Sequence, residues 1–265
     1  MNTPAEIIQN YVVIGVGKTK LSIPKMLIRA FLAGVFIAFA GVGATTAAVT
    51  VDNASIAKWI SACIFPAGLA MVLIAGSELF TGNCLMIIPL LERKATLCGV
   101  LKNWLFVYLG NLLGGMTIAA AVVFGHTYDL FSNALAGSAI DTAAAKVNLS
   151  FIDAFVRGIL CNALVCIAVW MSLAAKNVSG KIIGLFFPIM LFVLCGYEHC
   201  VANMYYIPAG LFALHHETYC AAATADLSVL TWGNFIGKNL LPVTLGNILG
   251  GAGIGTLYWF AYLHE

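Results

Sequence analysis

The stretch Gly76-Ser77-Glu78-Leu79-Phe80-Thr81-Gly82-Asn83 decides the fold, because it sets polar groups inside an apolar segment and recurs later in the chain. The second copy is Gly196-Tyr197-Glu198-His199-Cys200-Val201-Ala202-Asn203, with the same Gly-x-Glu-x4-Asn spacing. Carboxylate and imidazole groups at membrane depth are costly unless they are paired or line a polar path. Two such interruptions at matching positions indicate a pore or a carrier site.

The composition is that of an integral membrane protein. Of 265 residues, 62% are hydrophobic and only 9% are charged, whereas a soluble domain carries about 25% charged residues. The net charge of +2 is too small to suggest nucleic acid as a partner. The first 17 residues contain Glu6 and lack the basic start and long apolar core of a cleavable secretory signal.

No metal or cofactor site is expected. None of the eight cysteines belongs to a Cys-x-x-Cys pair, and most lie in apolar runs, where cysteine packs as a small hydrophobe. The string His215-His216-Glu217 lacks the His-Glu-x-x-His spacing of zinc proteases and is interpreted as a loop.

Six segments are apolar over the length that a spanning helix needs, which is about 20 residues. The second and fifth are too long for one helix and contain the two polar strings, so each is predicted to be broken, with turns around 79–83 and 197–201. Residues 4–20 are too short to span and are predicted to form a helix on the membrane interface. The six segments are 27–49, 60–91, 101–124, 155–175, 181–213 and 235–262.

The two halves of the chain repeat each other beyond the polar strings. Phe65-Pro66 precedes the first string as Phe187-Pro188 precedes the second, and residues 103–115 match residues 239–251. Three helices per half is an odd number, so we expect one transmembrane channel domain, 1–265, built from two inverted repeats, 27–124 and 155–262. The small residues of Gly110-x3-Gly114 and Gly246-x3-Gly250 are expected to allow close helix packing.

The basic residues orient the chain. With the N-terminus inside, nine lysines and arginines lie on the cytoplasmic side and four, Lys58, Lys146, Arg157 and Lys238, lie outside. Both termini are therefore predicted to be cytoplasmic.

These motifs resemble the formate/nitrite transporter family along essentially the whole chain. The resemblance implies an all-α, aquaporin-like fold in a homopentamer, with one pore per subunit, in the inner (cytoplasmic) membrane. It implies transport rather than enzymatic activity, and small monovalent anions or their acids as cargo: formate first, with nitrite, hydrosulfide or lactate as alternatives. The paired Asn-Pro-Ala motifs of aquaporins are missing from the sequence, which argues against a water or glycerol pore. The matching strings are 39–46, 76–83, 146–148, 158–166, 196–205 and 239–247.

The resemblance also assigns pore residues. His199 takes the central histidine position, Thr81 faces it across the pore, and Asn162 and Asn239 match carboxamides that line the pore. Lys146 corresponds to a vestibule charge that concentrates anions. The alternative for Thr81 is ordinary turn capping.

Other residues of the motifs are expected to have structural roles. Glu78 and Glu198 would repel an anion, so we expect them to accept hydrogen bonds from backbone N–H groups at the helix breaks. Asn83 and Asn203 are expected to satisfy backbone groups there as well.

Apolar constrictions are expected on both sides of the centre, where dry rings exclude hydrated ions. By resemblance, Leu79 and Phe192 form an outer ring and Phe65 and Leu69 an inner ring, with Phe80 as a further candidate.

The resulting hypothesis is proton-coupled passage. Lys146 and the half-helix N-termini near 83 and 201 attract an anion, His199 protonates it, and the neutral acid crosses the second ring. Plain anion conduction, with His199 donating only a hydrogen bond, is the rival within the family. An intramembrane hydrolase using Glu198-His199 lacks a nucleophile elbow and a third partner, and a non-transporting membrane protein would not explain two polar interruptions.

Overall fold

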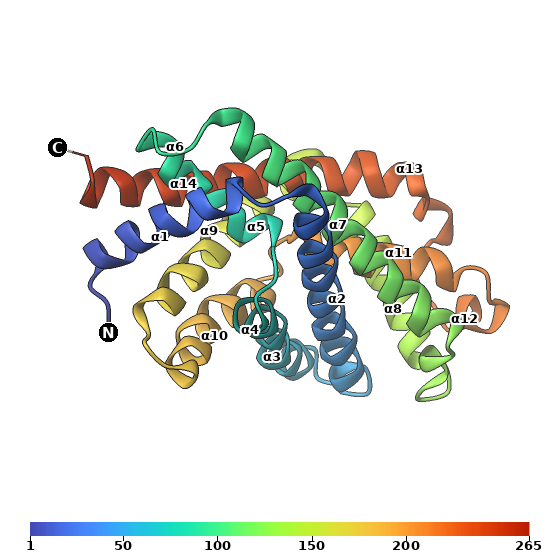
Figure 1. The fold of residues 1–265 in the computed structure, drawn as a ribbon. Coiled ribbons are helices and arrows are strands. Elements are labelled where there is room, and N and C mark those ends of the chain that lie inside the picture. Colours follow the sequence, from blue (N-terminus) through green and yellow to red (C-terminus); the bar gives the residue numbers. More distant parts are fainter. Residues whose placement is uncertain (265) are drawn as a thin grey trace.

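The computed structural model describes residues 1–264 as a bundle of helices (Figure 1). The helices are α1 (Pro4–Thr19), α2 (Ile23–Ala48), α3 (Ala54–Ile64), α4 (Pro66–Ala75), α5 (Phe80–Asn83), η1 (Cys84–Met86), α6 (Ile87–Leu91), α7 (Leu97–Phe124), η2 (Thr127–Asp129), α8 (Ala134–Val147), α9 (Phe151–Ala174), α10 (Val178–Leu194), α11 (Cys200–Ala213), α12 (Glu217–Ala221), η3 (Leu227–Val229), α13 (Trp232–Asn234), η4 (Phe235–Leu240) and α14 (Leu241–Tyr262).

Within residues 1–264, five helical segments are long and apolar enough to cross a membrane. They correspond to the first, third, fourth and sixth predicted spans, to within one residue at their C-terminal ends, and to the first part of the second. The fifth predicted span is divided into α10 and α11, each shorter than a membrane crossing. The five segments are Ile23–Ala48, Ala54–Ala75, Leu97–Phe124, Phe151–Ala174 and Trp232–Tyr262.

Two helix pairs, α2 with α7 and α9 with α14, form the most extensive contacts of the fold. Glycine permits the close approach in both pairs. A Cβ on Gly114 would lie 2.1 Å from the carbonyl oxygen of Phe31, and a Cβ on Gly250 would lie 2.1 Å from that of Ile159. The packing role predicted for these glycines is confirmed.

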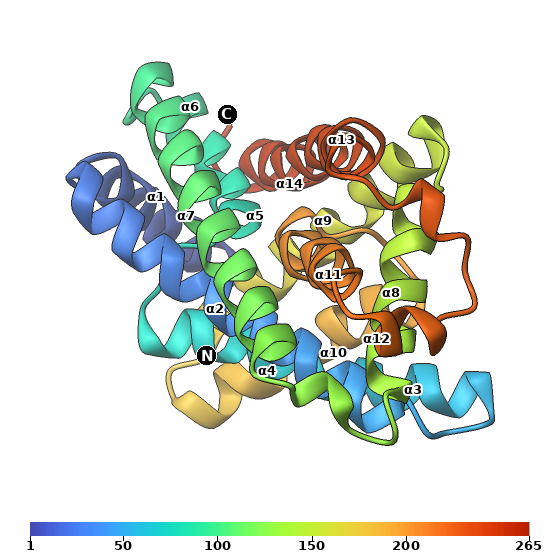
Figure 2. The same ribbon diagram turned by 90° about the vertical axis from the view of Figure 1, so that its right-hand side faces the viewer.

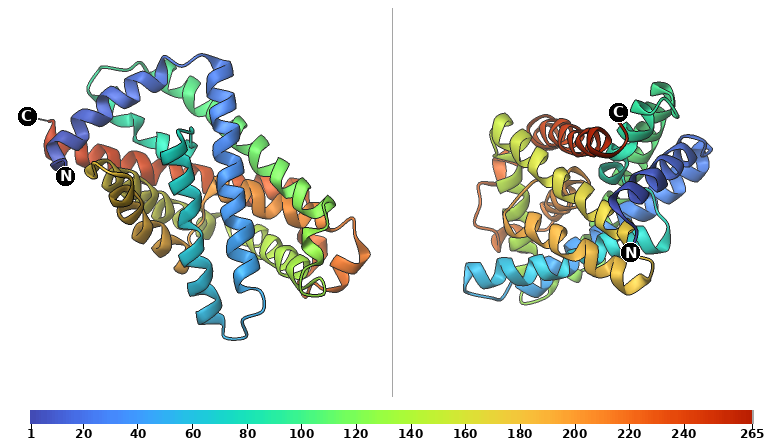
Figure 3. Two further views of the ribbon diagram at one scale, coloured as in Figure 1. Left: turned by 60° about the horizontal axis from the view of Figure 1, so that its bottom comes forward. Right: turned by 90° about the vertical axis from the view of Figure 1, so that its left-hand side faces the viewer.

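The first helix of the chain, α1, begins with a capping box in which Thr3 and Glu6 satisfy each other's backbone N–H groups. It packs against α6, α14 and α7. The N-terminus and the C-terminus lie at the same end of the bundle (Figures 1 and 3).

Helix α11 occupies the middle of the bundle (Figure 2). It packs against α7, α8 and α2, and nearly all of its residues are buried. The side chains at its first turn are therefore held in the interior, which is where the second polar string places His199.

Candidate functional site

Both polar strings are helix breaks in the structure. Helix α4 is followed directly by Gly76 (φ 82°), and α10 is followed by Cys195 and then Gly196 (φ 69°). Glycine is needed at both positions because side chains rarely tolerate positive φ. The helices resume at Phe80 and Cys200, so the first break lies about one turn before the predicted 79–83.

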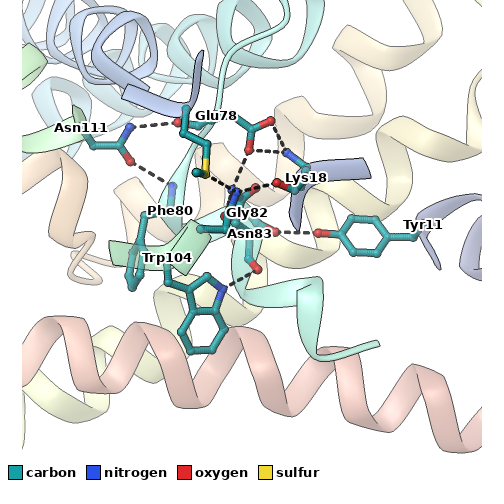
Figure 4. A network of polar contacts seen from close by, with 10 residues as sticks. Tyr11, Lys18, Glu78, Phe80, Gly82, Asn83, Trp104 and Asn111 are labelled. Atoms are coloured by element: carbon teal, nitrogen blue, oxygen red, sulfur yellow. Dashed lines mark hydrogen bonds and ion pairs between the residues drawn. The ribbon is translucent and has the colours of Figure 1, made fainter. Parts of the chain in front are cut away.

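Two buried asparagines hold the backbone at these breaks. Asn111 accepts a hydrogen bond from the Phe80 N–H (2.9 Å) and donates to the carbonyl oxygens of Ala30 (2.8 Å) and Glu78 (2.9 Å) (Figure 4). The carboxamide thus satisfies two backbone groups of the break, the Phe80 N–H and the Glu78 carbonyl, and ties them to the backbone of α2 at Ala30.

Asn247 does the same at the second break. It accepts from the Cys200 N–H (2.9 Å) and donates to the carbonyl oxygens of Gly158 (2.8 Å) and Glu198 (2.9 Å). We refer to Asn111 and Asn247 as the two clamp asparagines.

The Glu78 carboxylate lies in a buried polar cluster beside the first break (Figure 4). It accepts from Lys18 Nζ (2.8 and 2.9 Å) and from Asn83 Nδ2 (2.7 Å). Asn83 also donates to Asn103 Oδ1 (2.8 Å). The side chain of Glu78 is 6% exposed and that of Lys18 is 18% exposed, so this ion pair is largely desolvated.

The Glu198 carboxylate has an equivalent cluster beside the second break. It accepts from Lys146 Nζ (2.9 and 3.1 Å) and from Asn203 Nδ2 (2.7 Å), and Asn203 in turn donates to Asn239 Oδ1 (2.7 Å). Lys146 also lies 5.5 Å from the centre of the Tyr206 ring, within the range of a cation–π contact.

These clusters correct two expectations. Glu78 and Glu198 accept from a lysine and a carboxamide rather than from backbone N–H groups, and Asn83 and Asn203 satisfy the carboxylates rather than the breaks. The physical reason is that a buried carboxylate needs a counter-charge, whereas the neutral clamp asparagines can satisfy the backbone without one.

The two breaks meet through one contact at the centre of the protein. Thr81 Oγ1 lies 2.8 Å from His199 Nε2, and both side chains are buried. The approach of these two residues, which the resemblance implies, is therefore present in the structure.

The second ring nitrogen of His199 fixes the tautomer. His199 is the N-cap of α11, and its Nδ1 accepts the Ala202 N–H at 3.1 Å. An amide can only donate, so Nδ1 carries a lone pair and the proton of the neutral ring lies on Nε2. Nε2–H therefore donates to Thr81 Oγ1.

Cavities lie on both sides of this contact. A larger one, of about 600 Å³, is lined by Lys146, Glu198 and His199 among others. A smaller one, of about 200 Å³, is lined by Tyr11, Lys18 and Leu79 among others. Between them remains a space of about 10 Å³, lined by Ile37, Phe65, Leu69, Leu79, Val165, Ile189, Phe192 and His199.

Comparison with known proteins agrees with this geometry. The sequence model described as "Formate/nitrite transporter" matches residues 5–261. The chain belongs to the formate/nitrite transporter family. It is 37% identical, over 282 residues, to a "Probable formate transporter" of Methanothermobacter thermautotrophicus, covering 99% of this chain and 98% of the relative. It is 36% identical, over 250 residues, to the "Formate channel FocA" of Escherichia coli (strain K12), covering 91% and 87%.

Two solved structures have the same fold. A "Pentameric formate channel with formate bound" superposes with a TM-score of 0.81 at 32% identity, covering 91% of this chain and 98% of that chain. An "FNT family ion channel" superposes with a TM-score of 0.84 at 27% identity, covering 96% and 98%. The chain is thus a membrane transport protein of this family and not an enzyme.

The residues predicted to form constrictions are grouped in the structure differently from the expectation. Phe65 and Phe192 contact each other, with ring centres 5.7 Å apart, and both line the larger cavity. Leu69 and Leu79 line the smaller one. This grouping differs from the predicted pairing of Leu79 with Phe192 and of Phe65 with Leu69, because the break after α4 turns Leu79 back toward the cavity that Leu69 lines.

Three further side chains predicted to face the pore have other contacts. Asn162 donates to the carbonyl oxygens of Thr81 (3.1 Å) and Asn247 (2.7 Å) and so positions the central loop. Asn239 donates to the Lys146 carbonyl oxygen (2.9 Å) and belongs to the Glu198 cluster. Phe80 packs on Tyr108, with ring centres 4.9 Å apart.

The sequence did not lead us to predict the clamp asparagines or Lys18, the lysine of the first ion pair. Asn111 and Asn247 occur at the same place in the repeated strings 103–115 and 239–251, which is the signal that could have found them. The interval from Lys18 to Lys146 equals the interval from Arg29 to Arg157, so the repeat also includes α1 and α8. The interfacial helix predicted at 4–20 therefore carries part of the site.

Proposed function

We propose that this protein passes small monovalent anions, or their conjugate acids, across a membrane, and that formate is the main cargo. The observation that carries the proposal is the Thr81–His199 contact, located at the narrow space between two cavities. Relatives named as formate channels and transporters support formate as the first choice. Nitrite and hydrosulfide have the same size class and single charge and are the alternatives.

We further propose six membrane crossings in two inverted repeats. In this arrangement α10 and α11 together form the fifth crossing, which is discontinuous, and α3–α4 with α5–α6 forms its counterpart, the second. The matched ion pairs, Lys18–Glu78 and Lys146–Glu198, support the symmetry. We place the protein in the cytoplasmic membrane as a homopentamer, following the similar pentameric channel, with both termini inside because most basic residues lie on that side.

His199 is proposed to recognise the anion through Nε2–H. An anion reaching the narrow space sheds water, and a neutral donor there stabilises it without binding it as tightly as a fixed charge would. In the proton-coupled form of the mechanism, His199 must also become a cation. Protonation at Nδ1 would displace the Ala202 N–H, and losing such an N-cap contact costs about 1 kcal/mol. The rival, plain anion conduction, avoids this cost.

The test is stopped-flow uptake of formate, nitrite, hydrosulfide and lactate into proteoliposomes. His199→Asn is the informative variant, because asparagine can still accept the Ala202 N–H while it removes the Nε2 donor. His215→Asn is the matched control, since His215 is exposed in a loop. We expect formate to enter faster than through empty liposomes, and only His199→Asn to reduce that uptake.

Two results would count against these ideas. If no anion enters faster than through empty liposomes, the transport function itself is refuted. If electrical current in planar bilayers matches the anion flux one for one, proton exchange at His199 is refuted and conduction remains.

A further inference from the structure

The larger cavity carries positive charge beyond its one ion pair, Lys146–Glu198. Lys58, Lys146 and Arg157 all line it, against one carboxylate, Glu198. Lys146 is bound to that carboxylate through both oxygens, at 2.9 and 3.1 Å. A monovalent ion pair of this kind has little net field at a distance, so Lys146 is not the main source of positive potential here.

Lys58 and Arg157 are the charges left over. Both side chains are exposed, and within residues 1–264 neither has a carboxylate oxygen within ion-pair distance. The cavity therefore has a net charge of two positive units. The smaller cavity has no such excess, because Lys18 lines it and is paired with Glu78.

We propose that the larger cavity is an anion-holding site charged by Lys58 and Arg157, and that it prefers small dianions such as oxalate. The electrostatic attraction scales with the charge of the ligand, so a dianion gains twice the favourable energy of formate. Low-dielectric walls focus the potential within such a cavity. The volume of about 600 Å³ is ample for a hydrated dicarboxylate.

A dianion held there does not pass further. The space between the cavities is about 10 Å³ and is walled by Phe65 and Phe192. The cost of moving an ion into an apolar environment rises with the square of its charge, so it is about four times larger for a dianion than for a monoanion. The site therefore makes small dianions blockers of monovalent anion flux. This consequence rests on the proposed transport function, whereas dianion binding itself does not.

The charge of Lys58 can be tested with a matched control. Lys58→Gln removes the free charge from the cavity, and Lys238→Gln removes a charge from an exposed lysine that does not line it. In proteoliposomes at low ionic strength, we expect Lys58→Gln to lower formate uptake by about 2- to 10-fold. We expect Lys238→Gln to leave uptake unchanged and Lys58→Arg to restore it. The difference should shrink above 0.15 M salt, where the screening length is about 8 Å.

Oxalate, present on both sides of the membrane, provides the second readout. If Lys58→Gln lowers formate entry by a factor f, the half-inhibitory oxalate concentration should rise by about f squared, since the ligand charge doubles. Equal uptake and equal oxalate inhibition in the two glutamine variants would overturn the proposal.

Binding separates this proposal from the transport function. Oxalate titrated calorimetrically into the solubilised protein should bind the wild type and Lys238→Gln more tightly than Lys58→Gln, whether or not formate is carried. Wild type that carries formate but binds no oxalate would refute the site alone. Wild type that binds oxalate but carries no anion would refute the transport function alone.

Discussion

Replacing Asn247 by alanine should destabilise the second helix break more than any single substitution at the pore centre does. The change removes three hydrogen bonds, to the Cys200 N–H and to the carbonyl oxygens of Gly158 and Glu198. The asparagine is fully buried, so water cannot replace these partners. The N–H of Cys200 is left unsatisfied at the start of α11.

The magnitude follows from these contacts. Each hydrogen bond contributes about 1 kcal/mol net, and stranding a buried donor costs about 1–3 kcal/mol. The two lost bonds to carbonyl oxygens and the stranded Cys200 N–H together predict that the free energy of unfolding falls by about 3–5 kcal/mol. For chains of 150–250 residues, 1 kcal/mol shifts the melting temperature by about 2–4 °C, so we expect a decrease on the order of 10 °C. Asn247→Asp should be as harmful, because it keeps the acceptor but loses both donors and buries a charge.

The assay is a melting series on detergent-solubilised protein, followed by size-exclusion chromatography of the heated samples. Asn148→Ala is the control, because Asn148 is exposed at the end of α8. A melting temperature of Asn247→Ala within about 1 °C of this control, below what 1 kcal/mol would produce, would refute the clamp role.

Three further changes test other parts of the site. Thr81→Val removes the hydroxyl that meets the central histidine, at a cost of about 1 kcal/mol, so formate uptake should fall while the melting temperature changes little; unchanged uptake would exclude a role in passage. Lys18→Met leaves a buried carboxylate without its counter-charge, which typically costs about 3–5 kcal/mol, and adding Glu78→Gln should recover much of the lost melting temperature; no recovery would contradict a stabilising ion pair. Hydrogen bonds from the backbone and side chain of Thr3 lower the pKa of Glu6, so their contribution to α1 is present above the unfolded pKa and lost as pH falls through the folded one. The protection factors of α1 amides, which divide out the intrinsic pH dependence of exchange, should therefore fall in acid for the wild type but vary less with pH in Glu6→Gln, and identical pH profiles would refute the capping box.

Much of the fold could be predicted because apolar length and polar interruptions act locally. The apolar runs of this chain form helices in both halves, and in each half the helix is interrupted where a glycine is followed by a buried carboxylate. The first break still begins earlier than predicted, since the positive φ of Gly76 ends α4 before the polar residues are reached.

Partners of the polar side chains could not be predicted in this way. The spacing of Glu78 and Asn83 does not reveal that Glu78 meets Lys18 and that Asn83 meets Asn103, which arrive from other helices. Likewise, nothing local to Asn111 indicates that it reaches Phe80. Family resemblance located His199 and Thr81, while the hydrogen bond to Nδ1 that sets the tautomer required coordinates.

The clamp asparagines also bear on how such a protein can diversify. Leu79 and His199 are the residues at the same step of the two repeats, each directly before the half-helix that resumes the chain. The clamp asparagines bond only to backbone atoms at the breaks, so their hydrogen bonds do not depend on which side chain stands at this position. The first repeat could therefore acquire an apolar residue, Leu79, and the second an imidazole, His199. Substitutions at these two positions could change the cargo again while the hydrogen bonds around the breaks stay the same.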